Sequence, residues 1–155
     1  MKKIYVLDTN VLIQAPHALK CFDDNEVVLP LVVLEELDGH KRDEGERGAN
    51  VREAIRILEQ LRGAGDLVKG VKLDNGGFLR VEKNFKDVEL PKDMAEYKSD
   101  NRILKVCKGL SDTCKEQVIL VTKDILMRIK AQILGVKSED FTTEQGAGEG
   151  EQYSG

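Results

Sequence analysis

Short apolar runs alternate along the chain with longer segments whose apolar residues recur at helical spacing. Residues 3–7 (KIYVL), 26–29 (EVVL) and 117–121 (QVILV) are rich in β-branched side chains, which is typical of buried strands. From Val51 to Leu61 the large apolar residues trace one face of a helix. Strands that alternate with helices imply crossover connections. The pattern therefore predicts an α/β fold with a mainly parallel sheet covered on both faces.

The remaining segments are interpreted from their turn-forming and capping residues. Pro30 suits the first turn of a helix that would stop near Gly39. The charged stretch 40–50 has two glycines and no apolar residue larger than alanine, so it predicts a mobile loop. We also expect a hairpin or a loop flanked by strands over 70–82, a helix capped by Ser99 that continues through Leu110, and a helix over 124–134, with no firm element over 86–97.

Length and composition indicate a single domain followed by a tail. The chain has 155 residues, which is about one domain. Its 41% hydrophobic and 34% charged residues are typical of a soluble globular protein. After Phe141 the sequence TTEQGAGEGEQYSG has almost no apolar side chains to bury. We therefore predict one domain over residues 1–141 and a flexible Gly- and Glu-rich tail or linker over 142–155.

Composition also argues against several classes of protein. The longest apolar stretch, residues 27–34, is shorter than the roughly 20 residues of a membrane span. Too few apolar residues follow the lysine-rich start for a signal peptide, so we expect a cytoplasmic protein. Three dispersed cysteines and two histidines are too few for a typical zinc site. A net charge of -4 argues against tight nucleic-acid binding by charge alone, but not against a substrate whose phosphates are met by metal ions.

Acidic residues stand at or near the points where predicted strands lead into helices. Asp8 directly follows the first strand, and Asp124 comes shortly after the strand 117–121. Glu36 lies on the helix after the second strand, and Asp100 lies in the first turn of the helix that begins at Ser99. Sites in open parallel sheets form outside the carboxyl ends of the strands. If the strands are adjacent, these four acids converge at one end of the sheet.

Converging carboxylates repel one another, and a hard cation such as Mg²⁺ or Mn²⁺ relieves that repulsion. Two such ions about 4 Å apart can activate a water and stabilise the leaving oxygen of a phosphodiester. Four acids without His or Cys support therefore suggest phosphoryl chemistry that uses one or two divalent ions. Taken singly, Asp8, Asp100 and Asp124 are equally typical of helix starts. Helical periodicity does not choose between Glu35 and Glu36.

Four short motifs in this order resemble the signature of PIN-domain ribonucleases, over residues 1 to about 137. They are DTNVL at 8–12, PLVVLEELD at 30–38, DNRI at 100–103 and TKD at 122–124. The resemblance implies a three-layer α/β/α fold around a mainly parallel twisted sheet, and metal-dependent hydrolysis of single-stranded RNA. Glu36 is favoured over Glu35 because the family's acid stands six places after the residue that opens the helix, here Pro30, and is followed by a leucine, here Leu37. The resemblance thus assigns catalysis and metal binding to Asp8, Glu36, Asp100 and Asp124, with Asn10 and Thr122 as polar support.

More narrowly, residues 30–39 and the segments EDF at 139–141 and QYSG at 152–155 are similar to the N-terminal half of PhoH-like proteins. In those proteins a PIN domain precedes an ATPase domain of helicase type. The present chain has no GxxxxGK[ST] motif, so we expect a fragment whose tail leads to an ATPase domain that it lacks. PIN-like domains often pair, so the resemblance also implies a homo-oligomer.

A basic cluster just after Glu36 is the candidate for RNA binding. Lys41, Arg42, Arg47 and Arg52 could hold phosphates near the acids, although interspersed acids would cancel part of their charge. The chain has no Trp and few other aromatic residues, so no base-stacking platform is evident and we expect low sequence specificity.

Three functional classes follow from these observations. The leading one is a PIN-type ribonuclease, endo- or exonucleolytic, which includes the option of a toxin controlled by an antitoxin. The second is a non-catalytic RNA-binding or regulatory module of a PhoH-like ATPase. The third is a phospho-acceptor domain of receiver type, which Lys123 would suit, but Asp8 has no adjacent acid and Glu36 would have no role there.

Overall fold

The structure is a computed structural model that describes residues 2–83, 85 and 87–141. The predicted tail over 142–155 lies outside these residues. A single sheet of six strands forms the centre of the molecule. The first predicted strand and the strand at 117–121 have the expected bounds, and the second extends by one residue. The strands are β1 (Lys3–Leu7), β2 (Glu26–Pro30), β3 (Val71–Lys72), β4 (Phe78–Glu82), β5 (Gln117–Val121) and β6 (Lys137–Glu139).

The strand order, β3-β4-β2-β1-β5-β6, confirms a mainly parallel sheet. Only the short β3 runs antiparallel to its neighbour, β4, as the hairpin prediction for residues 70–82 requires. In the middle of the sheet Tyr5 of β1 lies opposite Val27 of β2 and Ile119 of β5, and all three are buried. The chain passes from β1 to β2 on one side and later enters β5 on the other side of β1. This reversal of strand order creates a topological switch point at the carboxyl ends of β1 and β5.

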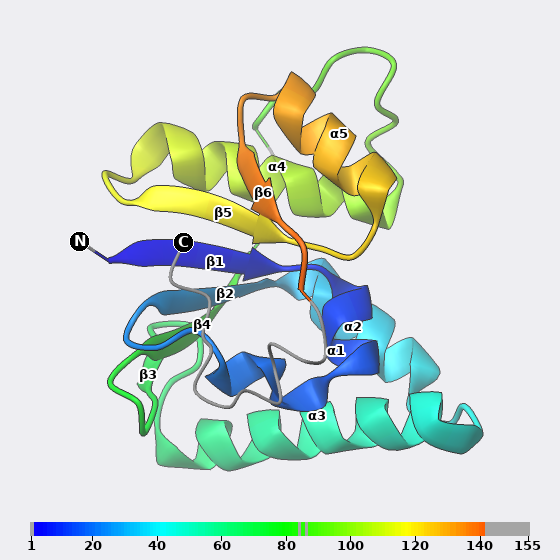
Figure 1. The fold of residues 1–155 in the computed structure, drawn as a ribbon, viewed down its shortest axis with the longest axis vertical. Helices are drawn as coiled ribbons and strands as arrows, with labels where there is room; N and C mark the ends of the chain where they lie inside the picture. Colours follow the sequence, from blue (N-terminus) through cyan, green and yellow to red (C-terminus); the bar gives the residue numbers. More distant parts are fainter. Residues whose placement is uncertain (1, 84, 86, 142–155) are drawn as a thin grey trace.

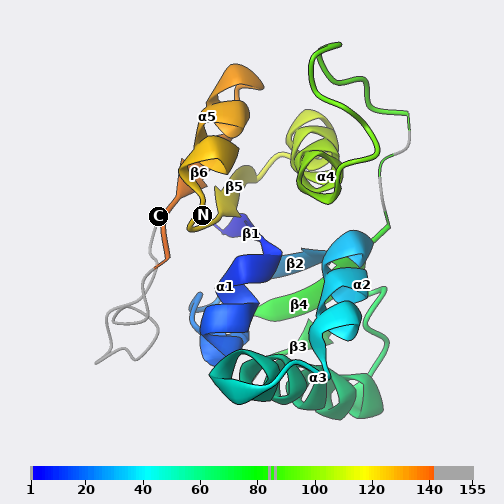
Figure 2. The same ribbon diagram turned by 90° about the vertical axis from the view of Figure 1, so that its right-hand side faces the viewer.

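Helices cover both faces of the sheet, as the alternating pattern predicts. In Figure 2, α1 and α5 lie on one side of the strands and α2 and α4 on the other, while α3 runs beneath α1 and α2. Figure 1 shows that α1 and α2 both lie toward the carboxyl ends of the central strands. The helices are α1 (Thr9–Gln14), the 3₁₀ helix η1 (Pro16–Lys20), α2 (Leu31–His40), α3 (Gly45–Ala64), α4 (Ser99–Thr113) and α5 (Ile125–Ile133).

The predicted loop over residues 40–50 is wrong, because α3 already begins at Gly45. Only residues 41–44 connect α2 to α3. Gly45 has a φ of 75°, which glycine adopts without strain. Gly48 packs so closely on this connection that a Cβ atom there would lie 1.6 Å from the backbone oxygen of Asp43. The glycines that suggested a loop therefore serve a tight helix-to-helix connection.

Strand β6 was not predicted from the sequence, because Lys137–Glu139 is short and polar and shows no strand periodicity. It pairs with β5 at the edge of the sheet and brings the chain to Phe141. The Phe141 ring is buried 6.0 Å from that of Phe22. Among the residues that the structure describes, no helix has the length and apolar character needed to cross a membrane.

Candidate active site

Asp8 lies where β1 and β5 end side by side. Its backbone N–H donates to the Val121 carbonyl oxygen at 3.0 Å, which extends the pairing of the two strands. The Asp8 side chain caps α1, because Oδ1 accepts from the Thr9 backbone N–H at 2.7 Å. Its other oxygen, Oδ2, accepts from the Thr122 hydroxyl at 2.7 Å. Asp8 therefore has the capping role that the sequence allowed and is also held in place by the end of a neighbouring strand.

Asp124 takes the corresponding position at the start of α5. Its Oδ1 accepts from the Leu126 backbone N–H at 2.9 Å, so it also caps a helix. The Asp124 backbone N–H donates to the Thr122 hydroxyl oxygen at 3.1 Å. Thr122 is fully buried, and through these two hydrogen bonds its hydroxyl links Asp8 to Asp124.

Glu36 enters the site from α2 and is held by two hydroxyl groups. The Thr9 hydroxyl donates a short hydrogen bond to Oε1, and the Ser99 hydroxyl donates to Oε2 at 2.8 Å. Glu35 is exposed on another face of the helix, with Oε1 3.9 Å from Arg102 Nη2. The structure therefore brings Glu36, and not Glu35, to the other acids.

The sequence suggested that Ser99 caps α4, but in the structure it does not. Lys98 occupies the N-cap position without a side-chain hydrogen bond, and Ser99 is the first residue of the helix. Its hydroxyl turns to Glu36 instead, because that carboxylate lies beside the start of α4. Sequence reasoning missed both hydroxyl donors to Glu36, since their partner is distant along the chain.

Asp100 follows in the first turn of α4 and contacts a lysine from α5. Its Oδ1 accepts from the Asn101 backbone N–H at 2.8 Å, and its Oδ2 lies 3.3 Å from Lys130 Nζ. The same ammonium group donates to Asn101 Oδ1 at 2.9 Å. The Lys130 side chain is only 16% exposed. The contact of Lys130 with Asp100 could not be predicted from the sequence, because α4 and α5 meet only in the folded protein.

The four acids line a single cavity of about 280 Å³. Asn10 lies on the same wall, whereas Thr122 supports Asp8 from behind. Arg47 and His40 reach the cavity from α3 and α2. The complete lining is Asp8, Thr9, Asn10, Ile13, Glu36, His40, Arg47, Ser99, Asp100, Ile103, Asp124 and Met127.

The other predicted RNA-binding residues lie elsewhere. Lys41 Nζ donates to Asp38 at 2.8 Å, and Arg52 Nη1 donates to the carbonyl oxygens of Lys41 and Asp43 at 2.9 and 3.3 Å. Arg42 is exposed and does not line the cavity. Of the four basic residues that the sequence singled out, the structure brings only Arg47 to the acids.

Burial and neighbouring charges raise the pKa of Asp8 above its usual value. Loss of hydration is the largest cause, and the negative charges of Glu36 and Asp124 add to it. The hydrogen bonds from Thr122 and Thr9 act in the opposite direction but do not compensate fully. The site thus holds more negative charge than its own hydrogen bonds neutralise.

The chemistry of these donors suits a hard divalent cation, because all four acids offer oxygen ligands to one cavity. Within residues 2–83, 85 and 87–141, no three His, Cys, Asp or Glu side chains are grouped to hold an ion. Both oxygens of Asp8 and of Glu36 accept hydrogen bonds from neighbouring residues, which orient these carboxylates.

Comparison with known proteins assigns the fold. Residues 5–142 match the family model described as "PIN domain". The chain belongs to the PIN domain family. The resemblance inferred from the four motifs is therefore confirmed. PIN domains are typically nucleases and generally use divalent metal ions.

Three curated relatives of this PIN domain are each called Protein PhoH2. The protein from Bacillus subtilis (strain 168) is 47% identical over 161 aligned residues. The alignment covers 100% of this chain and 36% of the relative. Those from Thermobispora bispora and Mycolicibacterium smegmatis are 40% and 39% identical, over 90% of this chain and 32% of each relative. The chain thus spans about a third of the length of these relatives.

Solved structures agree with the PIN fold. A domain of a functionally unknown protein from Methanocaldococcus jannaschii superposes with a TM-score of 0.57 at 20% identity, covering 90% of this chain and 91% of the other. A PilT N-terminus domain protein from Sulfolobus solfataricus P2 gives 0.56 at 14% identity, with 98% of each chain covered. At these identities the likeness concerns the fold alone.

Proposed function

We propose that this PIN domain is a divalent-metal-dependent ribonuclease that hydrolyses phosphodiester bonds of single-stranded RNA. The observation that carries the proposal is the convergence of Asp8, Glu36, Asp100 and Asp124 on one cavity at the switch point of the sheet. A cluster of this charge repels a phosphodiester unless cations intervene. Membership of a typically nucleolytic family supports the same reaction class.

The four acids would hold one or two ions of Mg²⁺ or Mn²⁺, which supply an activated water and neutralise charge on the phosphate. The surrounding residues position these acids. Thr122 and the Thr9 backbone N–H orient Asp8, and the hydroxyls of Thr9 and Ser99 orient Glu36. The amide of Asn10, on the cavity wall, can donate to a phosphate oxygen.

Cleavage of a labelled single-stranded RNA tests this proposal. We expect cutting with Mn²⁺ or Mg²⁺, none with EDTA, and a loss of at least roughly a hundredfold in Asp8→Asn and Glu36→Gln. Glu35→Gln is the matched control, because it changes the adjacent acid on the same helix, which lies outside the cavity. Equal activity in wild type and Asp8→Asn would contradict the proposal.

A second candidate function is a non-catalytic RNA-binding or regulatory module of a PhoH-like ATPase. The observation that favours it is that the chain spans about a third of its PhoH2 relatives, which leaves room for an ATPase domain as partner. RNA binding without cleavage in the presence of Mn²⁺ would favour this candidate.

We also propose that the protein forms a homo-oligomer, which light scattering in solution tests. We further propose a cytoplasmic location, which the free thiols of Cys21, Cys107 and Cys114 support.

A further inference from the structure

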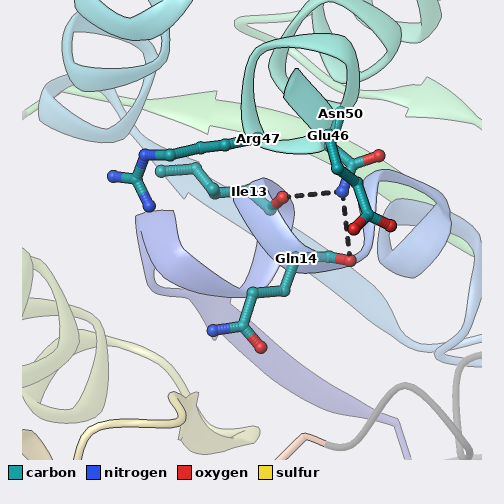
Figure 3. A pocket seen from close by; sticks show the side chains of 5 residues that line it. All are labelled: Ile13, Gln14, Glu46, Arg47 and Asn50. Atoms are coloured by element: carbon teal, nitrogen blue, oxygen red, sulfur yellow. Dashed lines mark hydrogen bonds between the residues drawn. The ribbon is translucent and has the colours of Figure 1, made fainter. Parts of the chain in front are cut away.

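A second cavity, of about 320 Å³, lies beside the cavity that the four acids line, which we call the acidic cavity. Figure 3 shows its lining, which comes from the end of α1 and the beginning of α3 and consists of Ile13, Gln14, Glu46, Arg47 and Asn50. Ile13 and Arg47 line both cavities, so these two side chains stand at the border between them. We call it the amide cavity, after Gln14 and Asn50. None of the four acids contributes to its wall.

Asn50 is fixed at the back of the amide cavity. Its side-chain Nδ2 donates to the carbonyl oxygens of Ile13 and Gln14, at 3.0 and 3.4 Å (Figure 3). These two bonds use the donor group of the amide and tie α3 to the end of α1. The Oδ1 atom receives no hydrogen bond within the part of the chain that the structure describes, so it is available as an acceptor.

Gln14 also lines the amide cavity. It is the last residue of α1 and is exposed. In Figure 3 its side chain extends away from Asn50 and Glu46. No described residue forms a hydrogen bond with this side chain. A free amide presents one donor group and one acceptor, a combination that matches the edge of a nucleobase.

Charge in the amide cavity disfavours a phosphate and favours a neutral group. The Glu46 carboxylate on its wall accepts hydrogen bonds and repels anions. Among the described residues Arg47 is the only cation of the lining, and it stands at the border with the acidic cavity. Acceptors inside and one cation at the border suit a nucleotide, whose amino and hydroxyl donors would lie inside the cavity and whose phosphate would lie at Arg47.

Arg47 is free to take that phosphate. Its Nε lies 3.5 Å from Asp43 Oδ2, and the side chain is half exposed. Among the described residues none is bonded to its terminal Nη1 and Nη2 atoms. A guanidinium with two free nitrogen atoms matches the geometry of a phosphate.

We propose that the amide cavity is a nucleoside site. It takes the base and ribose of a nucleotide that one further nucleoside separates from the scissile phosphate. Arg47 binds the phosphate between these two nucleosides, at the border of the two cavities, and Gln14 reads the edge of the base. The inference rests on the proposed ribonuclease function and extends it to substrate selection. It differs from the expectation of low sequence specificity, which considered only aromatic stacking and not hydrogen bonding by amides, and the mapping experiment below decides between the two.

Cleavage-site mapping on a randomised single-stranded RNA in Mn²⁺ tests the role of Gln14. We expect wild type to prefer certain bases at one fixed position, one nucleotide removed from the cut, by about fivefold, as one hydrogen bond allows. Gln14→Leu should abolish that preference. The matched control is Gln60→Leu, which changes an exposed glutamine of α3 outside both cavities. An unchanged preference in Gln14→Leu, or none in wild type, would overturn the proposal.

Kinetics test the role of Arg47. We expect Arg47→Gln to raise KM roughly tenfold while kcat changes little, because the lost contact is to a phosphate beside the reacting one. Arg62→Gln is the control, since Arg62 also lies on α3, pairs with Glu59 one turn away and lines neither cavity. A KM equal to that of Arg62→Gln would contradict the assignment.

RNA binding distinguishes failure of this inference from failure of the ribonuclease proposal. The probe is a fluorescein-labelled single-stranded RNA dodecamer, followed by anisotropy in Mn²⁺ and EDTA. If RNA is cut but neither variant differs from its control, the nucleoside site is wrong and the ribonuclease stands. If RNA is bound but not cut, and both variants weaken binding, the ribonuclease proposal is wrong, and the amide cavity binds RNA without a role in cleavage. If RNA is neither bound nor cut, both fall.

Discussion

Asp8 is the residue on which the account of the site depends most. It is 5% exposed, and the charges of Glu36 and Asp124 help to raise its pKa. A carboxyl whose pKa is higher in the folded than in the unfolded protein lowers the free energy of unfolding when it is ionised. That cost is present above the folded pKa and disappears as the pH falls through it toward the unfolded value, about 3.9.

Asp8→Asn should therefore stabilise the metal-free protein at pH 7.5, by about 0.5 to 2 kcal/mol. The gain should shrink toward pH 4, because wild-type Asp8 then becomes neutral as well. Excess Mn²⁺ should reverse the order, since an ion that binds only the folded wild type stabilises it by about 2.7 kcal/mol at 100 times its Kd. Thermal unfolding with and without Mn²⁺ measures both effects. A less stable metal-free variant at neutral pH would show that Asp8 acts mainly as a helix cap.

Lys130 already supplies one positive charge to the acidic cavity. Its ammonium group lies 3.3 Å from Asp100 Oδ2 and competes with any other cation for that carboxylate. We expect Lys130→Met to tighten Mn²⁺ binding about fivefold, which corresponds to roughly 1 kcal/mol for a solvent-screened charge. Calorimetric titration measures the change, and Lys137→Met on the exposed edge of β6 is the control. Unchanged or weaker binding in Lys130→Met would contradict this role.

At the scale of residues, the sequence predicts the acidic residues of the site better than the residues that bind to and orient them. Strand ends and helix starts identify Asp8, Asp100 and Asp124, because such positions are local. The hydroxyls of Thr9 and Ser99 and the Lys130 ammonium bind carboxylates on other elements. Their roles depend on how the elements pack, and no local pattern contains that information.

At the scale of elements, the connection from α2 to α3 is the part where the prediction was wrong. Its tightness depends on Gly48, whose Cα faces the backbone of Asp43. Arg52 reinforces the connection by donating to the carbonyl oxygens of Lys41 and Asp43. The same connection places Arg47 at the border of the two cavities. Charged residues near a site can thus organise the backbone rather than bind substrate.

Gly48→Ala should lower the free energy of unfolding by about 1 to 3 kcal/mol, because the added methyl group has no room beside the Asp43 carbonyl. Gly63→Ala on the same helix is the control, since a Cβ atom there meets nothing within 4 Å. Alanine is the better helix former, so the control should gain about 0.5 to 1 kcal/mol. Urea unfolding compares the two variants. Similar stabilities would show that the connection tolerates a side chain.

The strands were the most predictable elements, because β1, β2 and β5 are buried on both faces and consist of nearly continuous apolar residues. The edge strand β6 has no such signal. Helices α4 and α5 follow from the spacing of their apolar residues, whereas the beginning of α3 carries charges and glycines that are typical of loops. Sequence pattern predicts an element well where burial imposes a period and poorly where local backbone contacts decide.

At the scale of the whole molecule, strand order creates the site. Asp8 and Asp124 are far apart in sequence, yet β1 and β5 are neighbours and Thr122 links the two acids. Glu36 and Asp100 arrive on helices α2 and α4, which lie on the same side of the sheet (Figure 2). The sequence could predict this convergence only on the condition that the strands are adjacent, and the motif order of the PIN family supplied that condition.

The central claim is that Asp8, Glu36, Asp100 and Asp124 form a divalent-metal centre. Anomalous diffraction from crystals grown with Mn²⁺ tests it most directly, because the signal places the ion without reference to activity. The account predicts one or two manganese peaks in the acidic cavity, bound by oxygens of these acids, and none there in Asp8→Asn crystals. Manganese bound only elsewhere, or no manganese peak in the acidic cavity of crystals grown in saturating Mn²⁺, would contradict it.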